Sequence, residues 1–384
     1  MSVPVGLQRR RICYLSGTRA DFGLMRETLR QIDADPALDL GIIVTGTHLS
    51  EIHGHTVDEI SGSGLNVVAK IPIDVQTRTP ASMSKGIADC LWQTARILES
   101  TRPDMLLLLG DRGEMLAGAV AALNQGIATV HVHGGELSGT VDEPVRHAIS
   151  KLCSYHLVAT ESARDRLIRM GEAGNRIHVV GAPGLDGLTA LADQDRSVAL
   201  KELGLPDEAS FLLAVFHPVV QQADQAREQT LELLGALRRV GLPVIWLEPN
   251  ADAGARGVIE ALDRIALPAG SRRVAHLPRQ LFATAMLHAS AMVGNSSAGI
   301  IEAGSFGTPV VNVGARQHLR ERNPNTIDVL PQTNAISDAL LCCLDRGGYA
   351  PFNRYGDGHS APRIAQLMRE LPLSPAVLEK TNAY

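Results

Sequence analysis

The chain has 384 residues, of which 45% are apolar and 20% are charged, so it has the composition of a folded globular protein that is long enough for two domains. This balance excludes a disordered chain. The net charge of −5, with no block of lysine and arginine, excludes broad nucleic-acid binding. No run approaches the roughly 18 apolar residues that span a membrane, and the N-terminus lacks the apolar region of a secretory leader. We therefore expect a cytoplasmic protein with neither nucleic acid nor membrane as a partner.

Short apolar runs alternate with amphipathic stretches through the first half of the chain. The amphipathic stretches predict helices at 21–32, 83–98 and 161–170. The apolar runs predict strands at 12–15, 40–44, 67–71, 105–109, 128–132, 156–159 and 177–180. Continuous apolar strands that alternate with helices indicate a parallel sheet covered by helices on both faces.

The pattern breaks near 181–197, where the chain becomes rich in glycine and polar residues, and it then starts again. Further strands are predicted at 211–216, 244–247, 274–277, 291–293 and 310–313, with helices at 226–239, 296–305 and 361–371. We predict an α/β protein with two Rossmann-like, doubly wound domains, at 1–185 and 200–355, facing each other across a cleft. A helix and tail at 356–384 follow, and the sequence leaves open whether they pack on the first domain.

Polar motifs gather where two neighbouring predicted strands end. GDRGE at 110–114 follows one apolar run, and HVHGGE at 131–136 closes the next. VDEPVRH at 141–147 comes shortly afterwards. Parallel sheets deliver catalytic groups at the carboxyl ends of their strands, so these carboxylates, imidazoles and arginines predict an enzyme.

Two loops have the features of an anion site. GTRADFG at 17–23 follows the first strand and opens a helix, where backbone N–H groups and Arg19 would bind an anion. The alternative is a plain helix start capped by Asp21. In NSSAG at 295–299, small residues would let a diphosphate approach a helix N-terminus, and Glu302 would accept hydrogen bonds from sugar hydroxyls. One capping serine alone would explain only part of that motif.

Weaker signals concern single polar residues and a metal. His217, Asn250 and Arg316 end strand-like segments, and a structural role for His217 is as good an explanation as ligand binding. His131 with His133, or His48 with its histidine neighbours, could form a metal pair, but we expect no metal site. No GxGxxG or Walker A motif occurs, which argues against a dehydrogenase or NTPase, and the five cysteines include no CxxC pair.

Taken together and in order, these motifs resemble the hydrolysing UDP-N-acetylglucosamine 2-epimerase family of sialic-acid and related nonulosonic-acid biosynthesis. The resemblance rests on GTRADFG, TGTHL, GDRGE, HVHGGELSGTVDEPVRHAISKL, VFHP and NSSAGIIEAGSFGTPVVNVGARQ. The non-hydrolysing sister enzymes show RPE and a GDT-like segment where this chain has RAD and GDR. The resemblance implies a glycosyltransferase-B-like fold, UDP in the interdomain cleft, no cofactor, and a homodimer or homotetramer.

The family chemistry is anti elimination of UDP from UDP-N-acetylglucosamine, followed by hydration of the glucal to N-acetylmannosamine. The resemblance gives the proton transfers to the carboxylates of Asp111, Glu136 and Asp142. The resemblance also implies a part in catalysis for His48, His131 and His133. Some relatives carry a glutamate where this chain has His133. The residues assigned to the substrate or nucleotide are Arg19, Arg112, His217, Asn250, Ser296, Ser297, Gly299, Glu302 and Arg316.

Two alternatives stay open at this point. The same chemistry on UDP- or GDP-diacetylbacillosamine would serve legionaminic-acid synthesis. A retaining glycosyltransferase on the same fold would need an acceptor and would keep the configuration of the sugar.

Overall fold

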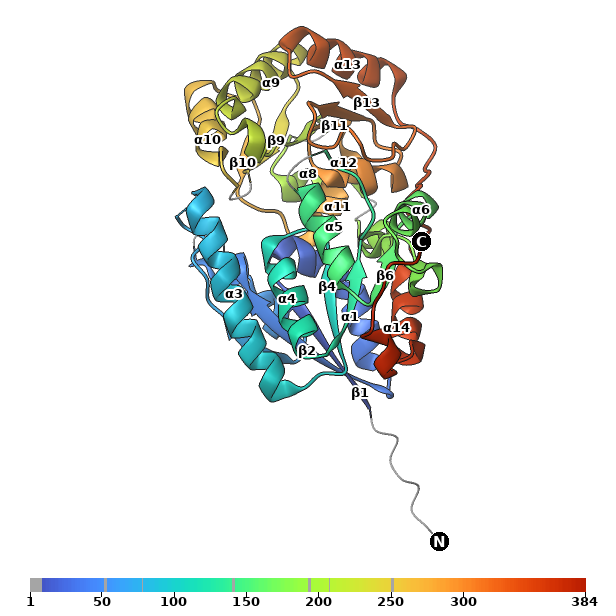
Figure 1. Cartoon of the computed structure of the whole chain (residues 1–384). Helices are drawn as coiled ribbons and strands as arrows, with labels where there is room; N and C mark the ends of the chain where they lie inside the picture. The colour runs from blue at the N-terminus through green and yellow to red at the C-terminus, as the bar shows by residue number, and fades with distance from the viewer. Residues whose placement is uncertain are drawn as a thin grey trace. The chain divides into compact units, whose positions relative to one another are not determined.

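The computed structural model describes residues 9–51, 54–77, 79–139, 142–192, 195–206, 208–249 and 252–384 (Figure 1). The chain divides into two compact units. Unit 1 comprises Met1–Glu136, Asp142–Asp186 and Gly356–Tyr384, and unit 2 comprises Leu137–Val141 and Gly187–Tyr355. The part of the chain that is described contains no helix long and apolar enough to cross a membrane.

Unit 1 is built on a seven-stranded parallel sheet in the order β3-β2-β1-β4-β5-β6-β7. Its strands are β1 (Arg10–Ser16), β2 (Leu38–Thr45), β3 (Val67–Ile71), β4 (Met105–Leu109), β5 (Ala128–Val132), β6 (Tyr155–Val158) and β7 (Ile177–Val179). Every residue of β4 and β5 is buried. β4 accordingly appears in the sequence as an unbroken apolar run, whereas β5 also buries Thr129 and His131.

In the described part of unit 1, six helices lie between strands or close to them in sequence, and a seventh, α14, comes from the end of the chain. They are α1 (Arg19–Ala34), α2 (Val57–Gly62), α3 (Pro80–Thr101), α4 (Gly113–Asn124), α5 (Asp142–Leu152), α6 (Glu161–Arg169) and α14 (Ser360–Glu370). Short 3-10 turns are η1 (Gly46–Leu49), η3 (Gly174–Arg176), η4 (Pro183–Leu185) and η7 (Pro375–Val377). A capping box of Thr18 and Asp21 fixes the start of α1 at the end of β1.

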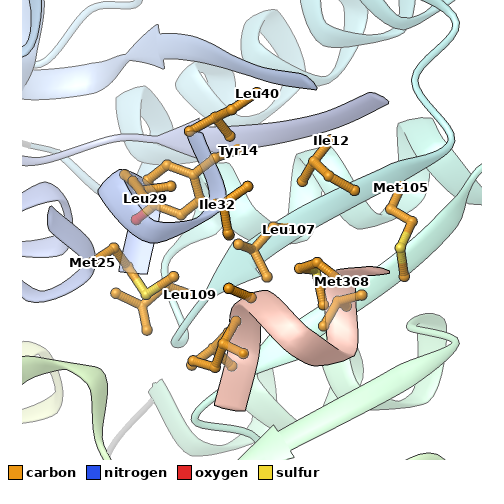
Figure 2. Packing of buried hydrophobic residues seen from close by; sticks show 14 of the residues in the cluster. Ile12, Tyr14, Met25, Leu29, Ile32, Leu40, Met105, Leu107, Leu109 and Met368 are labelled. Atoms are coloured by element: carbon orange, nitrogen blue, oxygen red, sulfur yellow. The ribbon is translucent and has the colours of Figure 1, made fainter. Parts of the chain in front are cut away.

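The terminal helix α14 packs on unit 1 and completes its core. Figure 2 shows Met368 of α14 among Ile12 of β1 and Met105 and Leu107 of β4, all of which are buried. Arg10 fastens the same helix, because its Nη1 donates to the carbonyl of Met368 at 2.7 Å. Burial of a side chain of this size contributes about 1.5–3 kcal/mol. The last segment of the chain, Gly356–Tyr384, is therefore part of unit 1, although Gly187–Tyr355 separates it in sequence from the rest of that unit.

Unit 2 contains a six-stranded parallel sheet in the order β10-β9-β8-β11-β12-β13. Its strands are β8 (Leu212–Val215), β9 (Val244–Leu247), β10 (Arg272–Val274), β11 (Ala291–Gly294), β12 (Val310–Val313) and β13 (Thr326–Val329). The apolar pattern places β10 two residues too late and misses β13. Both are partly exposed edge strands with charged residues, so neither has a continuous apolar run.

The helices of unit 2 are α7 (Leu188–Leu191), α8 (Arg196–Leu203), α9 (Ala226–Val240), α10 (Ala255–Arg264), α11 (Arg279–His288), α12 (Ser297–Ile301) and α13 (Thr333–Arg346). Short turns are η5 (Val220–Gln222) and η6 (Ala303–Ser305). The helix predicted at 296–305 ends early because Gly304 is pressed against another segment. A Cβ there would lie 2.6 Å from the carbonyl oxygen of Phe352. The chain turns through η6 at this close approach.

Both sheets have the strand order of a Rossmann-like domain, with the sequence direction reversing between the first and fourth strands. The reversal falls between β1 and β4 in unit 1 and between β8 and β11 in unit 2. Ligands of such sheets bind outside the carboxyl ends of the strands at these switch points. The two predicted Rossmann-like sheets are confirmed, and each unit contributes one such point.

Candidate active site

The loop after β1 combines a helix cap with a partly exposed cation. The Asp21 carboxylate accepts from the backbone N–H groups of Gly17 and Thr18, each at 2.9 Å. It also accepts from the Ser16 hydroxyl at 2.6 Å, so Asp21 serves the turn itself, as the capping alternative predicts. Arg19 is the first residue of α1, and its guanidinium forms an ion pair with Glu59 at the surface. Burial lowers the pKa of Arg19.

His48, in the turn after β2, is fully buried. Its Nε2 lies 2.9 Å from the Ser16 hydroxyl, and its Nδ1 lies 2.8 Å from the Thr56 hydroxyl. With both ring nitrogens bonded to the protein, His48 has no nitrogen left for a substrate. The imidazole instead ties the turn after β2 to the end of β1.

The loop after β4 presents three polar side chains. Asp111 is one-quarter exposed and forms an ion pair with Arg146 of α5. Arg112 is the N-cap residue of α4, and its side chain is more than one-third exposed. Glu114, in the first turn of the same helix, is buried. Asp111 is therefore a carboxylate that both touches a fixed cation and reaches the surface at the switch point.

His131 of β5 is buried and hydrogen-bonds to the loop that carries Asp111. Its Nε2 lies 2.7 Å from the carbonyl oxygen of Gly110, so it donates the proton, and its Nδ1 lies 3.0 Å from the Ser150 hydroxyl. Burial lowers the pKa of His131 to about 3, which keeps the ring neutral. Two bonded ring nitrogens leave no lone pair for a metal or a substrate.

His133 and Glu136 form a pair directly after β5. His133 adopts a left-handed backbone conformation with φ +64°, and its Nδ1 contacts the Glu136 carboxylate. The Glu136 side chain is 6% exposed, and that of His133 is 11% exposed. The imidazole of His133 therefore contacts the carboxylate of Glu136, to which the sequence resemblance assigned a catalytic role.

Helix α5 joins these loops through Arg146, a residue of the VDEPVRH motif that the sequence did not assign to the site. Arg146 is 1% exposed. Its Nη2 donates to Asp111, and its Nη1 donates to the backbone carbonyl of Glu136 at 2.9 Å. Asp142 is the first residue of the same helix, one turn before Arg146. The sequence feature that could have indicated Arg146 is its position in a helix that begins with the predicted catalytic carboxylate Asp142, on the face of that helix that is buried.

The switch point of unit 2 is organised by Asn295, which follows β11. Its side chain exchanges two hydrogen bonds with the backbone of His217, the residue beyond β8, at 2.7 and 2.8 Å. The carbonyl oxygen of Asn295 accepts from Arg316 at 3.2 Å and from Gln317 at 3.3 Å. Burial and the nearby Arg316 charge lower the pKa of His217 to about 3. His217 and Arg316, far apart in sequence, are thus brought together around one asparagine.

The serine motif after β11 starts a short helix. Ser296 caps α12 by accepting from the N–H of Ala298 at 3.3 Å, and the Ser297 side chain is half-buried. Gly299, which the sequence assigned to the diphosphate, faces the sheet, and its predicted part in binding stays a prediction. A Cβ there would lie 3.0 Å from Val310, so the missing side chain serves helix–sheet packing.

Glu302, at the end of α12, is buried and forms a 2.5 Å ion pair with Arg279 of α11. The remaining predicted binding residue, Asn250, lies outside the described residues. Among the residues that are described, no group of three histidine, cysteine, aspartate or glutamate side chains could hold a metal ion.

Comparison with known proteins identifies the family. The family model for UDP-N-acetylglucosamine 2-epimerase matches residues 30–369. The chain belongs to the UDP-N-acetylglucosamine 2-epimerase family. The resemblance stated from the sequence motifs is therefore confirmed, and membership in this family favours an epimerase over the glycosyltransferase alternative.

Three relatives in this family differ in the sugar they are named for. The chain is 44% identical over 375 residues to the hydrolysing UDP-N,N'-diacetylbacillosamine 2-epimerase of Legionella pneumophila, covering 98% of this chain and 100% of the relative. It is 33% identical to the UDP-N-acetylglucosamine 2-epimerase of Neisseria meningitidis, over 94% of this chain and 95% of that protein. It is 32% identical to the hydrolysing GDP/UDP-N,N'-diacetylbacillosamine 2-epimerase of Campylobacter jejuni, over 84% and 85%.

Solved structures of the epimerase family share the fold. The Neisseria meningitidis UDP-GlcNAc 2-epimerase bound to UDP-GlcNAc matches with a TM-score of 0.76 at 15% identity, over 93% of this chain and 99% of that chain. The Methanocaldococcus jannaschii UDP-GlcNAc 2-epimerase, in complex with UDP-GlcNAc and UDP, also matches with a TM-score of 0.76 at 19% identity, over 93% and 99%. The two Rossmann-like sheets of this family member therefore follow the glycosyltransferase-B-like pattern.

Proposed function

We propose that this protein is a hydrolysing 2-epimerase that converts a UDP-2-acetamido sugar into UDP and the free sugar of manno configuration. The observation that carries the proposal is the 44% identity, over nearly the whole of both chains, to a relative named for this hydrolysing reaction. The polar loops at the switch point of unit 1 supply the carboxylates that the reaction needs.

The same relative favours UDP-N,N'-diacetylbacillosamine as the substrate. The motifs alone placed UDP-N-acetylglucosamine first and the diacetyl sugar second, and we propose the reverse order because of this relative. UDP-N-acetylglucosamine stays the second candidate because the 33% identical Neisseria relative is named for it. The two sugars differ in their C4 and C6 substituents, whereas the bonds that react, at C1 and C2, are the same in both.

The chemistry is an elimination followed by a hydration. A carboxylate takes the proton from C2, the C1–O bond breaks with UDP as the leaving group, and a C1–C2 double bond forms. Water then adds its hydroxyl to C1, and a proton returns to C2 on the other face. Because the C2 proton is scarcely acidic, departure of the leaving group runs ahead and builds positive charge on the ring. A positioned acid or base contributes about 10²–10⁴-fold to such steps.

Asp111, Glu136 and Asp142 are the carboxylates that we assign to the proton transfers and to stabilising the charged ring. The buried Arg146 cation holds the Asp111 carboxylate and the Glu136 backbone, so the two loops keep a fixed relation. His133 lies on the Glu136 carboxylate and is the histidine that we assign to proton exchange with it. A fixed contact of this kind is what keeps a catalytic carboxylate aligned with its substrate.

His48 and His131 act on the reaction indirectly. Each is buried with both ring nitrogens bonded to the protein, so we place them as positioning residues for the loops after β1, β2 and β4. This revises the direct catalytic role expected from the sequence. His131 hydrogen-bonds to the carbonyl of Gly110, the residue that directly precedes Asp111 in the chain.

The nucleotide is assigned to cationic and small polar residues. Arg316, His217 and the two serines at the start of α12 surround the switch point of unit 2, and Glu302 is the acceptor that we assign to the ribose. In unit 1, Arg19 and Arg112 are the partly exposed guanidinium groups that we assign to the diphosphate. Planar guanidinium groups match the geometry of phosphate oxygens.

The test offers the purified protein both UDP sugars, with and without EDTA, and measures kcat/KM for UDP release while NMR identifies the sugar. We expect free sugar of manno configuration, a higher kcat/KM for the diacetyl sugar, and no effect of EDTA. A UDP-linked product would contradict hydrolysis. A preference for UDP-N-acetylglucosamine would select the second candidate, and loss of activity with EDTA would revive a metal-dependent mechanism.

A further inference from the structure

Glu114 is a buried carboxylate that neither the helix caps nor the proposed proton transfers use. It is the second residue of α4 and follows Asp111 by three positions, and it is 7% exposed. A glutamate in the first turn of a helix gains about 0.3–1 kcal/mol from the helix dipole, which is the ordinary explanation for such a residue. That explanation accounts for the charge at this end of α4 but not for its burial.

Three loops at the switch point of unit 1 meet at this side chain. A Cβ on Gly17, after β1, would lie 3.4 Å from Glu114 Cδ, and a Cβ on Gly46, after β2, would lie 3.1 Å from Glu114 Oε1. Gly46 has φ +63°, and its Cβ would also lie 2.3 Å from the carbonyl oxygen of Gly17. Gly46 is therefore required for the close approach of these loops, and the Glu114 side chain lies in van der Waals contact with Gly17.

The hydrogen bonds around Glu114 are incomplete. Within the described ranges, neither carboxylate oxygen of Glu114 accepts a hydrogen bond, and its one ion pair is Oε2 to Arg112 Nε at 3.4 Å. A carboxylate can accept about four hydrogen bonds, and with 9% of this side chain exposed, water can supply only part of them. A methionine or glutamine would fill the same space without that cost, so packing alone does not explain a carboxylate here.

The structure assigns Glu114 to sugar binding: we propose that its carboxylate accepts a hydrogen bond from a hydroxyl or amide N–H of the sugar ring of the substrate. A carboxylate repels the diphosphate, whereas sugar hydroxyls and acetamido N–H groups can donate the hydrogen bonds that the Glu114 carboxylate does not receive from the described residues. Asp111 lies in the same loop, so a sugar that offers its C2 proton to Asp111 comes within reach of this loop. The inference rests on the proposed function, because it takes the ligand to be a 2-acetamido sugar.

The test compares Glu114→Met, which removes the acceptor at similar volume, with Glu114→Gln, which keeps one neutral acceptor. KM and kcat for the UDP sugar, the Kd of UDP alone, and the thermal midpoint are measured. We expect Glu114→Met to raise KM about tenfold or more, as the loss of a hydrogen bond to a charged group does, while the Kd of UDP changes less than about twofold. Glu114→Gln should fall between Glu114→Met and wild type.

Stability distinguishes sugar binding from a structural role. Because the unmet carboxylate is unfavourable in the free protein, Glu114→Met should leave the thermal midpoint unchanged or raise it. A structural role predicts the opposite, a lower midpoint with unchanged KM. The matched control is Glu161→Met, which removes an exposed carboxylate from the first turn of α6 and should change neither KM nor the Kd of UDP.

A separate binding measurement keeps this inference distinct from the proposed function. UDP and UDP-N,N'-diacetylbacillosamine are titrated into the Asp111→Asn variant with and without Glu114→Met. A lower affinity for the UDP sugar, with unchanged affinity for UDP, supports the inference even without turnover. An unchanged ratio of the two affinities overturns it, even if wild type proves to be an active epimerase. Failure of wild type to turn over either sugar would instead count against the proposed function.

Discussion

Glu172 is the centre of a buried charge cluster in unit 1, and its replacement by glutamine should cost much of that unit's stability. Its carboxylate contacts Lys151 of α5 at 2.7 Å, Lys380 of the C-terminal tail at 2.6 Å, and His156 of β6 at 2.9 Å. Lys380 also donates to three backbone carbonyls at the end of α5, at 2.7–2.9 Å. The cluster therefore fastens the tail to the helix that carries Asp142 and Arg146.

The magnitude follows from the pKa of the carboxyl group. Burial alone would raise the pKa of Glu172, but hydrogen bonds from His156, Lys151 and Lys380 outweigh it and lower the pKa from 4.5 to about 2. At about 1.4 kcal/mol for each pKa unit, this corresponds to about 3 kcal/mol of folding free energy, in the range found for breaking buried ion pairs. Because the folded pKa is the lower one, the contribution is complete above pH 4.5 and is lost as the pH falls toward 2.

The assay is urea unfolding of wild type and Glu172→Gln between about pH 7 and pH 3.5, with amide hydrogen exchange of α5 to assign the transition to unit 1. We expect the variant to be less stable by about 3 kcal/mol at neutral pH, and the difference to narrow as the pH falls. Glu161→Gln, an exposed carboxylate, should change stability by less than about 0.5 kcal/mol. A loss below about 1 kcal/mol for Glu172→Gln, or a difference that widens in acid, would show that the cluster does not stabilise the unit in this way.

Two further predictions concern the site. Arg146→Met removes the cation that holds Asp111, and kcat should fall by about 10² or more while the Kd of UDP changes less than about twofold; an unchanged kcat would contradict a positioning role. Gly46→Ala should destabilise the protein by roughly 1–3 kcal/mol in urea unfolding, because φ is +63° and the new Cβ would lie 2.3 Å from Gly17 O. Gly62→Ala, with open space around it and no positive φ, is the matched control and should be neutral.

The sequence was most informative where the signal is local or periodic. The fully buried strand β4 appears as an unbroken apolar run and β5 as a mainly apolar one, and the ends of these strands locate the loops that carry Asp111 and Glu136. The capping role of Asp21 is likewise local, because its partners are its immediate neighbours. The edge strand β13 was missed because charged and half-exposed residues remove the apolar pattern.

The sequence could not show which polar residues face a ligand, because that depends on distant partners. His131 looks like a catalytic imidazole beside a strand end, but Ser150 and Gly110, far along the chain in both directions, take both of its ring nitrogens. Glu114 belongs to the GDRGE motif but had no predicted role. Its burial depends on loops that follow two other strands and contain Gly17 and Gly46, which no local pattern reveals.

The decisive measurement for the proposed elimination and hydration is the reaction in deuterated water. The protein is incubated with UDP-N,N'-diacetylbacillosamine, and the released sugar is examined by NMR and mass spectrometry. We predict free UDP and a sugar of manno configuration that carries one deuterium at C2, because the C2 proton is removed and replaced from solvent. A released sugar that keeps its C2 protium or its original configuration would contradict this mechanism.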